Sequence, residues 1–337
     1  MTVDTAAAVL PFEERSVLTR VKSAAGAWLP VLAALGILIL MLVAGQLYFG
    51  DFISPRLISA LFDNNPYLIV LAIGMTFVII TGGIDLSVGS VIAFSGLLGA
   101  QLFAAGLPAV VVLPLMVLSG TVIGVIIGIM VAVFDIQPFI ASLAGMFLAR
   151  GLAYVTSLKS LPIKDDTLNW LLGESWGGGG WYVTPGVVLA LVLVGVATWM
   201  LHYTRFGRTV YAVGGGEQSA RLMGLAVDRT KFLVYVISGT CAGIGGVLFA
   251  SYTQSGNPLA GLGMELQAIA AVVIGGTILT GGSGYMIGSL VGVLVYGLIQ
   301  IAITYMSVDS WWTYIVIGIM LLVFVVFQRA LSARRGG

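Results

Sequence analysis

The chain has 337 residues, of which 59% are hydrophobic and 9% charged, and its formal net charge is +1. A soluble domain carries about 25% charged residues because its surface faces water, so this composition excludes a soluble enzyme, a nucleic-acid-binding protein and a disordered chain. One cysteine and one histidine exclude an intramolecular disulfide and a His/Cys zinc site. The composition predicts a protein that crosses a membrane many times.

Ten apolar runs follow one another along the chain, and a membrane-spanning helix needs about 20 such residues. The runs cover residues 28–49, 67–80, 88–105, 110–134, 139–158, 182–201, 232–252, 266–280, 285–305 and 311–327. We expect helices, because a β-barrel would show alternating segments of about 10 residues. The second and eighth runs are short, so whether they cross the membrane completely is left open. The sequence predicts an all-α integral membrane protein with about ten transmembrane helices.

Lysine and arginine placement favours one orientation of these runs. With the N-terminus in the cytoplasm, eleven of the 15 fall in inner segments and Arg150 falls within a span, while the outer loops hold Arg56, Lys159 and Lys164. Cytoplasmic loops carry an excess of these residues, so we expect both termini to be cytoplasmic. The chain then divides into a cytoplasmic leader, one transmembrane domain and a cytoplasmic tail, at 1–25, 26–329 and 330–337.

A short pattern occurs twice. TGGIDLSVGS at 81–90 and TGGSGYMIGS at 280–289 share Thr-Gly-Gly and a Gly-Ser pair at the same spacing, and each follows one of the short runs. Paired interrupted spans in two halves of a chain indicate a transporter's binding site. Alternatively, both are tight turns whose glycines allow a sharp reversal, which the expected topology favours because both lie toward the inner side.

Ionisable residues in or beside the spans are few, and they are functional candidates because charge is costly in lipid. Asp85 is either a pathway carboxylate or, as we favour, a solvated turn residue that caps the helix beginning near Ser87. Glu265 opens a helix, where the dipole favours a carboxylate. We expect Arg150 to form a structural ion pair with a carboxylate rather than to contact a ligand.

Glycines recur at helical spacing in three places. They are Gly120, Gly124 and Gly128, then Gly239 and Gly243, and finally Gly288 and Gly292. Small residues on one helix face permit close helix crossing, so we assign them a packing role.

The polar loop at 202–231, on the expected inner side, carries an apolar patch. Gly214–Gly216 predict a flexible turn, and the run EQSARLMGL that follows predicts a short helix. A cytoplasmic loop has no internal reason to display Leu222, Met223 and Leu225, so we favour a helix that docks a partner protein. The alternative is a loop folded back on the membrane surface. The chain has no GxxxxGK[ST] motif, so any ATP hydrolysis falls to a partner.

Three ordered segments resemble the ribose-type sugar ABC-transporter permeases. They are GMTFVIITGGIDLSVGSVIAFSG at 74–96, the inner loop, whose YAVGGGEQSARLMGL resembles the family's YAxGGNxxAAxxxGI, and ELQAIAAVVIGGTILTGGSG at 265–284. Gly216 stands where the family usually has asparagine. Within the family, three further segments are most similar to the galactofuranose-type permeases, namely QSARLMG at 218–224, YTQSG at 252–256 and SWWT at 310–313.

The resemblance implies a permease subunit of a bacterial ATP-driven sugar importer, of type II-like architecture, in the inner membrane. Its expected substrate is a monosaccharide such as galactofuranose or ribose. The expected partners are a separate ATP-binding subunit, a second permease subunit and a periplasmic sugar-binding protein, while the chain itself is no enzyme and binds no cofactor. The second permease subunit is either identical or homologous, and the resemblance to galactofuranose-type systems favours a different one. The family's ATPase-coupling role falls on Gly214, Gly215, Glu217, Ala220, Arg221, Leu222, Met223 and Gly224.

Six polar residues are our candidates for the translocation path, which needs weak binding because conduction requires release. We expect the inner part of the path at Asp85, Ser87 and Ser90, and its outer part at Gln254, Asn257 and Glu265. The alternative is an ion-coupled secondary sugar carrier, for which Asp85 or Glu265 would be indispensable.

Overall fold

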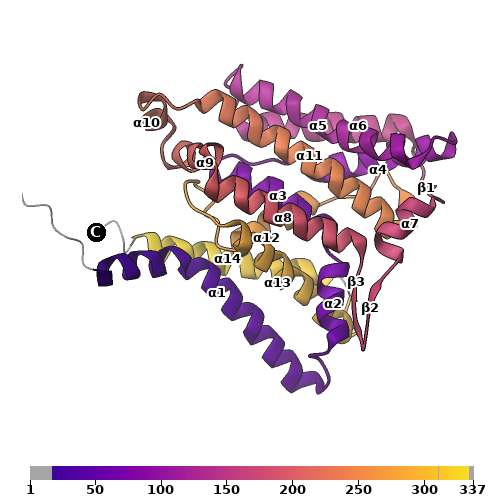
Figure 1. Cartoon of the computed structure of the whole chain (residues 1–337), viewed down its shortest axis with the longest axis horizontal. Helices are drawn as coiled ribbons and strands as arrows, with labels where there is room; N and C mark the ends of the chain where they lie inside the picture. The colour runs from indigo at the N-terminus through magenta and orange to yellow at the C-terminus, as the bar shows by residue number, and fades with distance from the viewer. Residues whose placement is uncertain (1–16, 310, 334–337) are drawn as a thin grey trace, which may run out of the picture.

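The computed structural model describes residues 17–309 and 311–333, which are mostly helical (Figure 1). The helices are α1 (Val17–Phe49), α2 (Pro55–Asp63), α3 (Pro66–Ile80), α4 (Val88–Ala104), α5 (Ala109–Ala132), α6 (Pro138–Thr156), α7 (Asp166–Gly173), α8 (Pro185–Tyr203), α9 (Arg205–Gly215), α10 (Glu217–Leu222), α11 (Val227–Thr253), α12 (Met264–Ile274), α13 (Met286–Tyr305) and α14 (Trp311–Ala333). Short antiparallel strands pair β1 (Leu161–Pro162) with β4 (Ser255–Gly256), and β2 (Trp176–Gly178) with β3 (Trp181–Val183). Most of the expected leader, 1–16, and the end of the expected tail, 334–337, lie outside the described residues.

Each predicted apolar run coincides with a helix, namely α1, α3 to α6, α8 and α11 to α14. In the described residues, six helices are long and apolar enough to cross a membrane: α1 from Trp28 onward, α5, α6, α8, α11 and α13. The pair α2 and α3 passes the same test together but bends by 55°, while α4, α12 and α14 contribute shorter apolar stretches. The architecture is therefore that of an integral membrane protein. Ten complete spans and cytoplasmic termini stay predictions.

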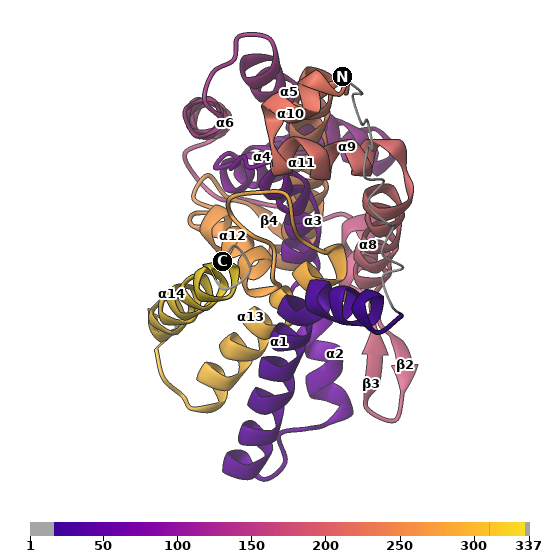
Figure 2. The ribbon, with the colours of Figure 1, turned by 90° about the vertical axis from the view of Figure 1, so that its left-hand side faces the viewer.

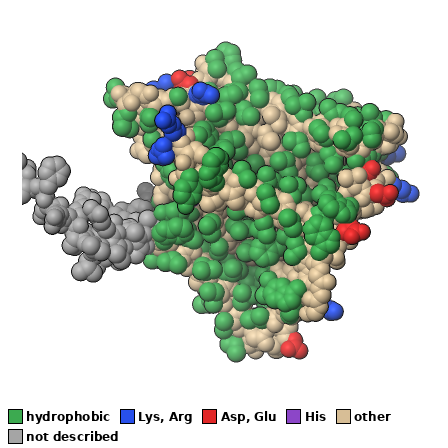
Figure 3. Space-filling view, viewed as in Figure 1, with side chains coloured by type: hydrophobic (Ala, Val, Ile, Leu, Met, Phe, Trp, Pro, Cys, Tyr) green, Lys and Arg blue, Asp and Glu red, His purple; other side chains and the backbone are tan. Residues whose placement is uncertain are grey.

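Charged side chains gather at two ends of the molecule, and the surface between them is largely apolar (Figure 3). One end carries α9 and α10 with a basic cluster, and we call it the basic end. The other carries α7 and the β2–β3 hairpin, and we call it the hairpin end (Figure 1). Between the ends, α5, α6 and α8 expose many large apolar side chains. A belt of this kind suits contact with lipid.

Helix α3 lies in the middle of the molecule (Figure 2), and every one of its residues is buried. Its sequence, PYLIVLAIGMTFVII, contains no charge. A helix that is apolar on all sides belongs in a core, and α8, α11, α12 and α13 pack around it. The last residue of α3, Ile80, lies against α9 at the basic end.

Helix-spaced glycines bring neighbouring helices into backbone contact, as predicted. A Cβ on Gly120 of α5 would overlap the carbonyl oxygen of Gly239 in α11. A Cβ on Gly292 of α13 would likewise overlap the carbonyl oxygen of Ala271 in α12. Small residues at a crossing let two helices approach this closely, so the packing role is confirmed.

Candidate functional site

Helices α9 and α10 form a short arm at the basic end, which we call the coupling arm and define as residues 205–224. The chain leaves α8 at Thr204, whose hydroxyl accepts a 3.2 Å hydrogen bond from the N–H of Gly207. A threonine at this position satisfies one of the free N–H groups of a helix start. The arm therefore begins with a defined direction relative to α8.

The link between the two helices is shorter than predicted. The flexible turn expected over Gly214–Gly216 is wrong in extent, because Gly214 and Gly215 belong to α9 and Gly216 alone separates it from α10. Helix α10 begins at Glu217, as predicted. Its Ala220 is buried in a small apolar cluster with Val213 and Val227. The arm is thus held by packing as well as by its link.

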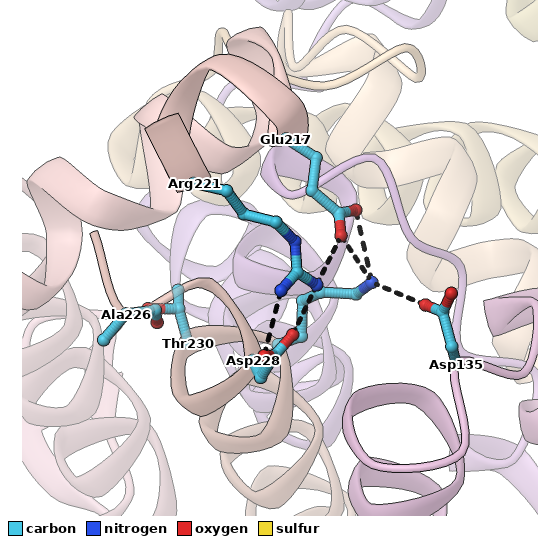
Figure 4. A network of polar contacts seen from close by, with 7 residues as sticks. Asp135, Glu217, Arg221, Ala226, Asp228 and Thr230 are labelled. Carbon is cyan, nitrogen blue, oxygen red and sulfur yellow. Dashed lines mark hydrogen bonds and ion pairs between the residues drawn. The ribbon is translucent and has the colours of Figure 1, made fainter. Parts of the chain in front are cut away.

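An ion-pair network fixes one side of α10 to the rest of the molecule (Figure 4). Arg221 contacts both Glu217, at 3.0 Å, and Asp228 of α11. Lys231 of α11 bridges Glu217, at 3.1 Å, and Asp135 of the loop between α5 and α6, at 3.6 Å. Partial burial opposes ionisation of Glu217, but the hydrogen bonds from Lys231 and Arg221 outweigh it and lower the pKa of that carboxyl. A network of several charges orients a helix better than one exposed pair does.

The end of α10 turns apolar side chains to the outside. Leu222 is 85% exposed and Met223 is 67% exposed, and no part of the described chain covers them. Gly224 follows at a φ of +74°, a left-handed conformation that glycine adopts readily. Exposed apolar side chains on a well-fixed element mark a protein interaction surface, which is the arrangement the docking prediction requires.

Helix α9 touches the end of α3, directly before the first Thr-Gly-Gly segment, and touches the second segment itself. The N–H of Gly282 donates a 2.8 Å hydrogen bond to the carbonyl of Ile80 at the end of α3. A Cβ on Gly214 would overlap that carbonyl oxygen and the Gly282 nitrogen. The Tyr211 hydroxyl donates to the carbonyl of Gly284 at 2.6 Å. Helix α9 of the coupling arm therefore packs against the end of α3 and against the turn that follows α12.

The two repeated segments have the geometry of tight turns, as one of the two interpretations predicted. Gly82, Gly281 and Gly282 have φ values of +82°, +87° and +78°, which strain residues with a side chain. The repeat shows that both segments need glycine, but it does not show that they meet. Tyr211 and Ile80 were therefore missed by the sequence analysis, because hydropathy and motif spacing carry no information on this contact.

Asp85 is a buried carboxylate with three hydrogen bonds. It accepts from the Ser87 N–H at 2.9 Å, the Ser87 hydroxyl at 2.6 Å and the Ser238 hydroxyl of α11 at 2.6 Å. The predicted capping of the helix is wrong, because Asp85 accepts from the N–H of Ser87, which precedes α4, and among the described residues no side chain caps the start of α4. The predicted solvation is wrong, because the Asp85 side chain is fully buried. The carboxylate ties the turn to α11.

Arg150 of α6 has other partners than the carboxylate that we expected. Its guanidinium donates to the carbonyls of Pro258 and Ala260, at 2.6 and 2.9 Å. Among the described residues it forms no ion pair within 4 Å, so that prediction is wrong. The reason is that the loop from 254 to 263 lies against α6 and presents two backbone carbonyls to Arg150. A guanidinium is a strong hydrogen-bond donor to such groups.

The structure places the candidate path residues in separate surroundings. Glu265 lies in the first turn of α12, and its side chain packs against Gly89 in the first turn of α4, beside the buried Ser90. Gln254 donates to the Ser251 carbonyl at 2.7 Å, and Asn257 accepts from the Leu259 N–H at 2.9 Å, so both shape the loop. Asp85 and Ser87 instead pair with each other. Glu265, expected in the outer part of the path, thus lies against the residue that precedes Ser90, which we expected in the inner part.

Comparison with known families gives a match over residues 57–325 to the family described as branched-chain amino acid transport system / permease component. The chain belongs to this family. It is therefore a permease, a transport component rather than a catalyst, and the predicted resemblance to permeases is confirmed.

Several curated permeases are similar to the chain over most of their length. The fructose import permease protein FruG of Bifidobacterium longum is 44% identical over 315 residues, 91% of this chain and 93% of the relative. The inner membrane ABC transporter permease protein YjfF of Escherichia coli is 43% identical over 312 residues, with 90% and 93% covered. The ribose import permease protein RbsC of Bacillus subtilis is 38% identical over 301 residues, with 89% and 92% covered. No solved structure gives a significant match.

The family and the apolar helices together determine the location of the chain. It is a multi-pass inner-membrane protein. The apolar belt between the basic end and the hairpin end is then the part that lies in the bilayer.

Proposed function

We propose that the chain is the permease subunit of an ATP-driven importer for a monosaccharide in its five-membered ring form, such as galactofuranose, ribose or fructose. The names of the relatives support import of fructose and ribose. The QSARLMG, YTQSG and SWWT segments, which resemble galactofuranose-type permeases, support the third sugar. All three sugars can adopt a furanose ring, so the ring form is the feature that we propose the substrates share.

The coupling arm is the observation that carries this proposal. Its ion pairs hold α10 on one side, while Leu222 and Met223 are exposed on the other. A separate ATP-binding subunit that packs on these two side chains would move α10 as it binds and hydrolyses ATP. The chain has no P-loop motif of its own, so the ATPase must come from a partner.

Movement of α10 would reach the membrane helices through α9. Gly214 contacts the last residue of α3, and both Gly214 and Tyr211 contact the turn after α12. Packed backbone contacts transmit displacement because interiors are close-packed. We propose that the end of α3 and this turn shift together and change access to a path beside α4 and α12. The candidate path residues there are Asp85, Ser87, Ser90, Gln254, Asn257 and Glu265.

The orientation follows from the basic residues. Arg205, Arg208, Arg229 and Lys231 lie at the basic end, which we place in the cytoplasm by the positive-inside rule. The hairpin end then faces the periplasm, where a sugar-binding protein would deliver the substrate. A second, different permease subunit would complete the path.

The energy source tests the proposal against an ion-coupled carrier. We would purify the tagged chain with its partners, reconstitute them in liposomes with the sugar-binding protein, and measure uptake of labelled sugar. Uptake should stop when ATP is depleted and continue when ionophores collapse the proton and sodium gradients. Uptake that survives ATP depletion and fails with ionophores would contradict the proposal and favour the carrier.

A further inference from the structure

A cavity of about 800 Å³ lies at the hairpin end, between α2, α13, α14 and the β2–β3 hairpin. Its lining extends from Trp181 of the hairpin to Gln267 in α12. Gln267 is three residues after Met264, where α12 begins beside the start of α4. The cavity thus extends from the hairpin end to the first turns of α12. Its volume falls within the range of about 300 to 1,000 Å³ that is typical of small-molecule sites.

The polar groups that line the cavity are almost all uncharged. Three amides, Asn64 of α2, Gln267 of α12 and Gln300 of α13, come from three helices, and all are partly exposed. Gln300 is oriented by a 3.1 Å hydrogen bond to the Tyr296 hydroxyl. Arg56 is the single charged residue among the described residues that line the cavity. Each amide offers both donors and an acceptor, which matches a ligand rich in hydroxyl groups.

Aromatic side chains supply a large share of the apolar part of the lining. Tyr252 of α11 is 48% exposed, Tyr314 of α14 is 52% exposed and Trp181 is 53% exposed. Tyr67 supports Tyr252, with ring centroids 5.9 Å apart. Aromatic rings combine a broad apolar surface with a polar group, so they can pack on the C–H face of a sugar while the amides bind its hydroxyls. Lipid acyl chains have no hydrogen-bonding groups with which the amides could pair.

We propose that this cavity is a carbohydrate-binding site carried within the single chain, in which Asn64, Gln267 and Gln300 bind hydroxyls and Tyr252, Tyr314 and Trp181 pack on the ring. The site deepens the proposed function, because it would receive the sugar from the periplasm before the sugar reaches α12. None of the six candidate path residues lines it. Binding should be weak, since the sugar must leave again.

Cysteine protection tests the site directly. The chain has one native cysteine, Cys241, which is buried in α11 and should not react with a polar thiol reagent. Gln300→Cys and Gln267→Cys place a reactive thiol in the cavity, and Lys164→Cys places one at an exposed position outside it. The permease with its ATPase, in liposomes, is labelled from the hairpin side with a membrane-impermeant methanethiosulfonate. D-fructose, D-ribose and galactofuranose are tested separately, without the binding protein, so that a docked protein cannot act as the shield.

We expect a sugar that the unmodified transporter imports to slow labelling at positions 300 and 267. Each variant lacks one of the three amides, so its own Kd applies; the rate should fall about threefold when the sugar is at about twice the Kd of that variant, because about a third of the sites are then free. Labelling at position 164 should not change. Equal rates with and without each imported sugar would overturn the site. Labelling that is slow with or without sugar, and that becomes fast only after lipid is removed, would also overturn it, since a lipid would then fill the cavity. Absence of ATP-dependent uptake by the unmodified transporter would contradict the proposed function instead.

Discussion

The N–H of Gly282 donates a 2.8 Å hydrogen bond to the carbonyl oxygen of Ile80. This bond joins the turn after α12 to the last residue of α3, so two halves of the chain meet at one point beneath α9. Ile80 is held in place by the buried helix α3, and Gly282 lies in the turn that follows the 11-residue helix α12. A displacement of α9 therefore acts on both helices at once.

A single methyl group at Gly214 tests this contact. Gly214→Ala would overlap the Ile80 carbonyl and the Gly282 nitrogen, and overpacking of this kind costs about 1–3 kcal/mol. We expect a lower Tm in detergent and a transporter that hydrolyses ATP with little sugar uptake. Gly215→Ala is the matched control, because a Cβ there meets nothing within 4 Å. Equal behaviour of the two variants would mean that the contact does not transmit movement.

The ionisation of Glu217 should control the order of α10. Its hydrogen bonds with Lys231 and Arg221 lower its pKa below the ordinary 4.5 despite partial burial. The stabilisation is therefore fully present above pH 4.5 and is lost as the pH falls through the lowered pKa. Because the groups are partly exposed and solvent-screened, the effect should be at most about 1 kcal/mol.

A spin label reports this change locally. A nitroxide on Met223→Cys should become more mobile as the pH falls through the lowered pKa of Glu217, with the overall fold monitored by circular dichroism. Glu217→Gln in the same background should give the mobile spectrum already at neutral pH. An immobile label in that double variant would show that packing of Ala220, rather than the ion pairs, holds α10.

Substitutions of Asp85 distinguish a structural role of its carboxylate from a role in ion coupling. In Asp85→Asn the amide can still bond Ser87 and Ser238, because serine hydroxyls both donate and accept. We expect most of the ATP-driven uptake to persist. Asp85→Leu leaves buried serine groups unpaired, at about 1–3 kcal/mol each, and should lower the Tm clearly. Loss of uptake in a stable Asp85→Asn protein would instead support an ion-coupled mechanism.

Arg150 should act by fixing the loop in front of α6. Arg150→Leu removes both hydrogen bonds to the Pro258 and Ala260 carbonyls, and leaving such groups unpaired costs about 1–3 kcal/mol. Thermal unfolding in detergent measures the loss. Arg150→Lys should recover part of it, because an ammonium can still donate to both carbonyls. A Tm unchanged in Arg150→Leu would show that the loop holds its shape without the guanidinium.

The sequence predicted the helices well because hydropathy is a local property. All ten apolar runs are helices, and α10 begins at Glu217 as the polar loop indicated. Helix α2, over Pro55–Asp63, was missed because its mean apolarity is low and it is only 9 residues long. Gly214 and Gly215 were assigned to a turn from their intrinsic flexibility, whereas both belong to the last turn of α9, where Gly214 packs against Ile80.

The site could be predicted only where its residues are consecutive. Leu222 and Met223 were recognisable as a docking patch because apolar residues stand out in a basic loop. Gln267 and Gln300 come to one cavity from different helices, and no motif in a single sequence joins them. The cavity is formed by the packing of helices that are far apart in the sequence, so the sequence alone could not predict it.

Association with an ATPase tests the central claim most directly. The tagged wild-type chain, extracted in mild detergent, should bring with it a P-loop ATPase whose hydrolysis responds to a sugar-loaded binding protein. Leu222→Asp puts a charge on the exposed docking surface and should lose the ATPase while the permease still inserts in the membrane. Val183→Asp makes the same chemical change on an exposed valine of the hairpin and should retain the ATPase. Recovery of the ATPase with Leu222→Asp at the wild-type level, or its absence from the wild-type chain, would contradict the account.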